Sequence, residues 1–112
     1  MTPFEYKIMS TLCSNDIDAK MLENQLSEIA VKNRDYTGVG LYTEFSVSDT
    51  ASLLPEDKNR MIDNPALYLS HPELENGAGV ILWLEGRKIS TLECFVYDGN
   101  WPNDESLFEI HT

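Results

Sequence analysis

The chain has 112 residues and carries 19 acidic against 8 basic side chains, which gives a formal net charge of −11. This length fits one domain, and a composition of 42% apolar and 24% charged residues is typical of a globular protein rather than a disordered one. The negative charge disfavours direct binding to nucleic acid or to an anionic membrane surface, because both are polyanions. It leaves open a basic partner, a metal ion or no special partner at all.

The N-terminal segment lacks a basic region followed by a long apolar run, so we expect no signal peptide. The longest apolar run, residues 80–84, is far shorter than the ~20 residues that span a bilayer. Cys13 and Cys94 are the only cysteines, and without a secretory signal we expect both to be reduced. Together these features predict a soluble cytoplasmic protein.

Helical patterns occupy the first third of the chain. The segment Thr2-Pro3-Phe4-Glu5 reads as a capping box, with Thr2 as the N-cap and Glu5 reaching back to it. Apolar side chains then recur every fourth residue, which predicts a helix over residues 3–12. A longer stripe of helical period predicts a second helix over residues 16–32; its apolar members are Ile17, Met21, Leu22, Leu26, Ile29 and Ala30.

After residue 36 the apolar period changes to that of β-strands. Gly38 and Gly40 suggest a bulge or a close backbone approach, Asn76-Gly77-Ala78-Gly79 reads as a turn, and Glu85-Gly86-Arg87-Lys88 as a tight hairpin. Helices followed by antiparallel strands predict an α+β fold, with N-terminal helices packed on a mostly antiparallel sheet of four to six strands. The predicted strands are residues 39–47, 67–70, 80–84, 88–97 and 107–110.

The predicted strand 88–97 contains a candidate functional carboxylate. One face of it is apolar, whereas the other presents Glu93 beside aromatic residues. If that face is covered, Glu93 is a buried acid with a raised pKa, which suits a general acid or base. A small-molecule or enzymatic site would then lie between sheet and helix, lined by Glu93, Tyr97, Thr43 and Tyr42. The alternative is that Glu93 is half-exposed, or is buried and hydrogen-bonded for structural reasons.

No other group of residues has the spacing of a catalytic or metal site. His71 and His111 share no common element, and we expect both to face solvent. Neither cysteine has a basic neighbour in sequence that would stabilise a thiolate. We therefore expect no catalytic residues, no metal and no cofactor, which favours a non-enzymatic role.

The acidic excess is concentrated near the C-terminus. Residues 73–112 contain eight acids and two bases, a net charge of −6, and they include Trp101, Asp104 and Glu105. An acidic rim beside aromatic residues suits a basic protein partner, because charge speeds encounter and aromatic side chains anchor it. The alternative is a solvated surface that keeps the protein soluble.

Several segments resemble a family of small uncharacterised bacterial proteins. The matching motifs are Thr37-Gly38-Val39-Gly40 with Thr43-Glu44-Phe45, then Gly77-Ala78-Gly79 before an apolar strand, then Leu92-Glu93, and finally Trp101-Pro102. A Leu-x-x-Gln helix is matched by Leu22 to Gln25. The resemblance covers most of the chain and implies a bacterial origin and one compact domain, without implying an activity. Glu93 falls on a distinctive position of that pattern.

The sequence is compatible with two functions. The first is a non-enzymatic protein-binding module, inhibitor- or immunity-like by analogy, that uses an acidic and aromatic C-terminal surface to engage a basic partner. The second is a small-molecule-binding or enzymatic domain with a buried carboxylate at Glu93. We expect a monomer or a homodimer formed through a sheet edge. The candidate site residues are Glu93, Tyr97, Trp101, Asp104, Glu105, Tyr42 and Thr43.

Overall fold

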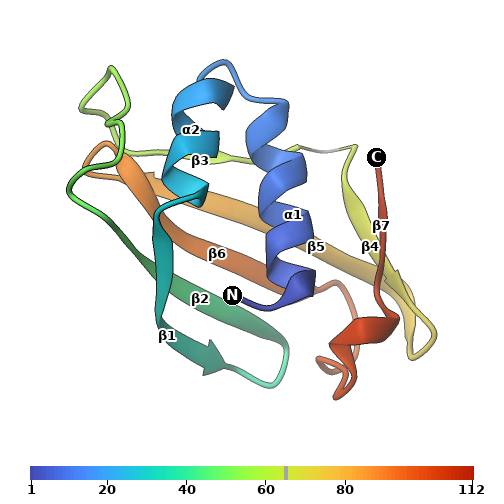
Figure 1. The fold of residues 1–112 in the computed structure, drawn as a ribbon. Helices are drawn as coiled ribbons and strands as arrows, with labels where there is room; N and C mark the ends of the chain where they lie inside the picture. Colours follow the sequence, from blue (N-terminus) through green and yellow to red (C-terminus); the bar gives the residue numbers. More distant parts are fainter. Residues whose placement is uncertain (65) are drawn as a thin grey trace.

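The computed structural model describes residues 1–64 and 66–112 and contains two α-helices and a seven-stranded antiparallel sheet (Figure 1). This confirms the predicted α+β class with N-terminal helices on an antiparallel sheet. The elements are α1 (Pro3–Ser14), α2 (Ala19–Leu26), β1 (Ile29–Tyr36), β2 (Gly40–Val47), β3 (Arg60–Ile62), β4 (Tyr68–His71), β5 (Leu74–Glu85), β6 (Lys88–Val96), the 3₁₀ turn η1 (Glu105–Leu107) and β7 (Glu109–His111).

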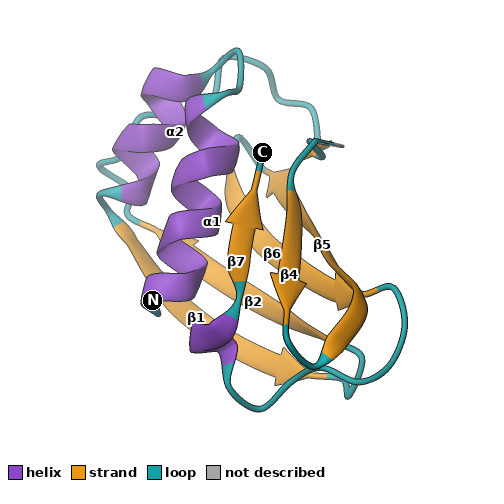
Figure 2. Cartoon of the chain, turned by 90° about the vertical axis from the view of Figure 1, so that its right-hand side faces the viewer, coloured by secondary structure: helices purple, strands orange, loops and turns teal. Residues whose placement is uncertain are grey.

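The strands are ordered β1-β2-β6-β5-β4-β7, and β3 also pairs with β5. The central β5 is long enough to pair with β6 on one side and with both β4 and β3 on the other. Both helices lie on the same face of this sheet, as Figure 2 shows. No helix in the described part of the chain covers the second face, which we call the open face.

The helix-covered face holds one hydrophobic core. Alternate residues of β2 and β6, such as Leu41, Phe45 and Leu92, point into it and meet Ile8 of α1 and Leu22 of α2. The opposite residues of the same strands are half-buried or exposed. The described parts of the chain contain no helix that is long and apolar enough to cross a membrane.

The prediction of a helix over residues 16–32 is wrong at both ends. Ile17 is 93% exposed and precedes α2, and the helix ends at Leu26. Residues 29–36 form β1, which pairs along its length with β2. Ile29 fits the helical stripe, but Ile29 and Val31 together also fit a period of two, and pairing with β2 decides for the strand.

Two further strands differ from expectation. β5 begins at Leu74, so the predicted turn at 76–79 lies inside a strand, and Gly77 takes a φ of +71° there to follow an irregular register with β4. β3 is too short for a sequence signal and brings the sheet to seven strands, beyond the four to six expected. The hairpin between β5 and β6 is confirmed, with Gly86 and Arg87 at φ +58° and +65°.

Candidate functional site

The sheet separates the predicted site residues into two environments. Tyr42 of β2 lies directly opposite Glu93 of β6, and both project from the face that no helix covers. Thr43, the next residue along β2, points to the helix side and is fully buried. The prediction that Thr43, Tyr42 and Glu93 line one pocket between sheet and helix is therefore wrong.

The buried carboxylate of this protein is Glu5, not Glu93. Glu5 is fully buried, and Arg34 of β1 donates two hydrogen bonds to it, from Nε at 3.0 Å and from Nη2 at 2.6 Å. The Thr43 hydroxyl donates a third at 2.6 Å, and the backbone N–H of Thr2 donates a fourth at 2.8 Å. Burial alone would raise the pKa of Glu5, but the bonds from Arg34, Thr43 and Thr2 lower it from 4.5 to about 2. The group is an anchor between α1 and the sheet that stays charged near neutral pH, where it is unsuited to proton transfer.

The sequence predicted the contacts of Glu5 with Thr2 but not those with Arg34 and Thr43. The predicted capping box is present, because the Thr2 hydroxyl also accepts from the Glu5 N–H at 3.1 Å. The capping motif gives no sign that the helix N-terminus packs on β1 and β2. Only the pairing of Arg34 opposite Thr43 brings both donors to the Glu5 carboxylate.

On the open face, Glu93 is half-buried and holds two aromatic side chains. The Tyr42 hydroxyl donates to one carboxylate oxygen at 3.2 Å, and the Trp83 indole Nε1 donates to the other at 3.1 Å. The negative charge of Glu93 and this hydrogen bond raise the pKa of Tyr42. Glu93 thus fixes the orientation of one ring from β2 and one from β5, on either side of its own strand.

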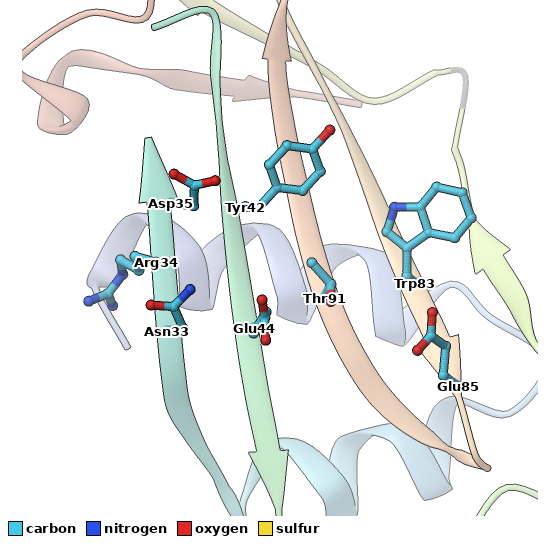
Figure 3. A pocket seen from close by; sticks show the side chains of 8 residues that line it. All are labelled: Asn33, Arg34, Asp35, Tyr42, Glu44, Trp83, Glu85 and Thr91. Atoms are coloured by element: carbon cyan, nitrogen blue, oxygen red, sulfur yellow. The ribbon is translucent and has the colours of Figure 1, made fainter. Parts of the chain in front are cut away.

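Beside this cluster the sheet surface is hollowed. The hollow has a volume of about 640 Å³. Figure 3 shows Tyr42 and Trp83 projecting from strands on two sides of Thr91, with the carboxylates of Glu44 and Glu85 nearby. Its lining residues are Asn33, Arg34, Asp35, Tyr42, Glu44, Trp83, Glu85 and Thr91. We call this set the acidic hollow; sequence reasoning singled out only Tyr42 among its members.

Tyr97 lies beyond the end of β6 and is 59% exposed. Its ring packs edge-on against Phe95, with centroids 5.5 Å apart. Both rings lie over Gly79 of β5, where a Cβ atom would collide with them. Tyr97 therefore extends the aromatic surface of the open face without lining the acidic hollow.

Trp101, Asp104 and Glu105 form a separate group that closes one end of the core. Trp101 packs against Phe4 and Phe108, with centroids 6.2 and 5.0 Å away, and its indole donates to Glu105 at 2.8 Å. Asp104 accepts bonds from the hydroxyl and the backbone N–H of Ser106, which lower its pKa and begin η1. These contacts give the three side chains structural partners within the chain.

The histidines and cysteines also have structural surroundings. His71 is buried, contrary to the expectation that it faces solvent: its Nδ1 accepts from the Glu73 N–H, so Nε2 donates to the Asp104 carbonyl. His111 stacks on Tyr68 and bonds Ser70. Both cysteines are free and buried, and burial raises the pKa of Cys13 to about 12. Within residues 1–64 and 66–112, no group of His, Cys, Asp and Glu side chains is arranged to hold a metal ion.

Comparison of the chain with protein-family models, with curated proteins and with solved structures finds no match. The resemblance to small bacterial proteins therefore rests on the motifs quoted above. Any function must be argued from the site itself.

Proposed function

We propose that this protein is a non-enzymatic protein-binding module, inhibitor- or immunity-like in character, which engages a basic protein partner. The observation that carries the proposal is the open face of the sheet, where ordered aromatic side chains are interspersed with carboxylates. Much of this face comes from β5 and β6, within the acidic last third of the chain. The surface involved is thus the sheet face around Glu93 and Tyr97, rather than the structural cluster of Trp101, Asp104 and Glu105.

The exposed apolar area of this face supports a docking role. Tyr42 is 40% exposed, Met61 49% and Tyr97 59%, and Trp83 lies between the first two in the strand order. Single exposed apolar residues are common on protein surfaces, but contiguous aromatic patches mark interaction sites. Tyrosine and tryptophan are also the side chains most enriched among residues that contribute strongly to protein binding.

The charge of the face supports a basic partner over an acidic or neutral one. Asp35, Glu44 and Glu85 are exposed around the acidic hollow. A surface with charges of one sign attracts a protein surface of the opposite sign from a distance. Salt screens the charges and so weakens this attraction. The net charge of −11 adds to this attraction over the whole molecule.

The proposal is tested by affinity capture with charge-matched variants. Immobilised wild type should retain basic proteins from a cell extract at low salt and release them as salt rises. The double substitution Glu44→Lys and Glu85→Lys should abolish this capture. Glu23→Lys with Glu56→Lys changes the net charge equally at exposed positions outside the acidic hollow, and should preserve it. Failure to recover any protein, or equal loss with both pairs, would contradict the proposal.

The alternative, a small-molecule or enzymatic site at Glu93, has weaker support. Both carboxylate oxygens of Glu93 already accept hydrogen bonds from aromatic side chains, and no helix encloses the face that it occupies. The proposed location of the module is the cytoplasm. Its support is the pair of buried thiols, Cys13 and Cys94, which are free in the structure and need no oxidising compartment.

A further inference from the structure

The acidic hollow follows from the size of the residues in one row of the sheet. Thr91 of β6 lies directly opposite Glu44 of β2 and Trp83 of β5. Its short side chain stands between two long ones, so the surface sinks at Thr91 and the neighbours become walls. The volume of about 640 Å³ is ample for the end of one long side chain from another molecule.

The aromatic walls of the hollow are held in place before any partner arrives. Tyr42 and Trp83 donate to the two oxygens of the same Glu93 carboxylate, at 3.2 and 3.1 Å. Rings that are already ordered lose less conformational entropy on binding. Glu93 is therefore a positioning residue for the two walls.

The carboxylates of the hollow have no cationic partner among the residues that the structure describes. Among residues 1–64 and 66–112, neither Asp35, Glu44 nor Glu85 takes part in an ion pair. Arg34 also borders the hollow, but its guanidinium is bound to Glu5 by two hydrogen bonds. The hollow thus presents aromatic faces and net negative charge, the combination that attracts an organic cation.

We propose that the acidic hollow receives an arginine side chain of the basic partner, an assignment that rests on the protein-binding function proposed above. A guanidinium is planar and weakly hydrated, so it stacks on the rings of Tyr42 or Trp83 while its N–H groups donate to Glu44 or Glu85. A lysine ammonium is more strongly hydrated and makes no planar stack. Two copies of this chain do not fit face to face, because each open face would bring its carboxylates against the same carboxylates of the other.

The two tryptophans provide a probe and a control in the same protein sample. Trp83 lines the hollow, whereas Trp101 lies in the second acidic and aromatic cluster beside Glu105. Titration of the ¹⁵N-labelled protein with a capped tetra-arginine peptide should move the indole N–H signal of Trp83 and leave that of Trp101 in place. A tetra-citrulline peptide, neutral and of nearly the same shape, should move neither signal. Equal shifts of both signals, or none, would overturn the proposal.

Variants of the hollow separate its parts. Thr91→Leu should fill the floor and weaken peptide binding by about tenfold or more. Thr91→Val, which keeps the size of the side chain and removes only its hydroxyl, should bind as wild type does. Glu93→Gln should broaden or shift the free Trp83 indole signal before peptide is added, because the wall loses its charged acceptor. If Thr91→Leu binds the peptide normally, the arginine does not occupy the hollow.

The arginine assignment and the protein-binding function can fail separately. If the peptide does not bind but capture of basic proteins still depends on Glu44 and Glu85, the partner uses the face without an arginine in the hollow. If the peptide binds as expected but capture is indifferent to those residues, the proposed function is wrong.

Discussion

At the scale of single residues, Glu5 shows how surroundings set the chemistry of a carboxylate. It is buried more completely than Glu93, yet four hydrogen bonds keep it ionised. Removing one partner of such a pair leaves the other without compensation in a partly desolvated site. We therefore expect Glu5→Gln to destabilise the protein by about 3 kcal/mol in urea denaturation. Glu56→Gln, at an exposed loop position, should have almost no effect.

The lowered pKa of Glu5 also predicts how stability depends on pH. Because the folded-state pKa of about 2 lies below the ordinary 4.5, the unfolded state binds the proton more readily. The stabilisation is fully present above pH 4.5 and is lost as the pH falls towards 2; it amounts to about 3 kcal/mol. The free energy of unfolding of Glu5→Gln should vary less over this range than that of wild type. Parallel pH profiles for the two proteins would contradict this role.

At the scale of the element, one buried amide ties α2 to the sheet. The Gln25 Nε2 donates to the carbonyls of Ser52 and Arg87 at 2.7 and 3.1 Å, and its Oε1 accepts from the Ile89 N–H at 2.8 Å. All three partners are backbone groups in segments distant in sequence. This side chain therefore joins the short helix, the loop after β2 and the β5–β6 hairpin.

Loss of this side chain should loosen the hairpin where it meets the helix. Gln25→Ala leaves the buried Ile89 N–H without its side-chain acceptor, removes a donor from the Ser52 carbonyl and opens a gap in the packing, with an expected cost of about 3 kcal/mol. The Arg87 carbonyl still accepts from the Leu54 N–H at 3.0 Å. Hydrogen exchange should show faster exchange at the Ile89 amide, beyond the change in global stability. Lys20→Ala on the exposed side of the same helix should leave that amide protected. Unchanged protection of Ile89 in Gln25→Ala would argue against the tether.

The predictability of the elements follows from which forces act locally. The capping box at Thr2, the alternation of β2 and the hairpin at Gly86 are local patterns, and the sequence alone sufficed to predict them. The pairing partners that make 29–36 a strand, and that carry β5 through Gly77, lie elsewhere in the chain. Local propensity cannot report such pairings.

The candidate site was predicted only in part, again because strand pairing has no local signal in the sequence. The alternation of side chains predicted that Glu93 and Tyr97 lie on one face of their strand. It did not predict which face of the sheet the helices cover. The sequence placed Trp83 only within the predicted strand 80–84, and its position beside Glu93 depends on the register between β5 and β6. The hollow at Thr91 requires three strands in register and has no signature in any one of them.

At the scale of the whole molecule, part of the net charge of −11 comes from carboxylates on the open face of the sheet. Carboxylates on the open face make association of two such faces unfavourable, and the edge strand β1 carries a bulge near Lys32 that disturbs edge-to-edge pairing. We therefore expect a monomer of 12.7 kDa in light scattering after size-exclusion chromatography at low salt. A stable dimer under these conditions would show that a surface other than the open face drives self-association.

The most direct test of the central claim is competition at the open face. Proteins captured by the immobilised wild type are challenged at constant ionic strength with the tetra-arginine peptide, or with tetra-citrulline at the same concentration. If the partner places an arginine in the acidic hollow, tetra-arginine should release it and tetra-citrulline should leave it bound. Retention of the partner at peptide concentrations that saturate the Trp83 indole shift would show that the open face is not where the partner binds.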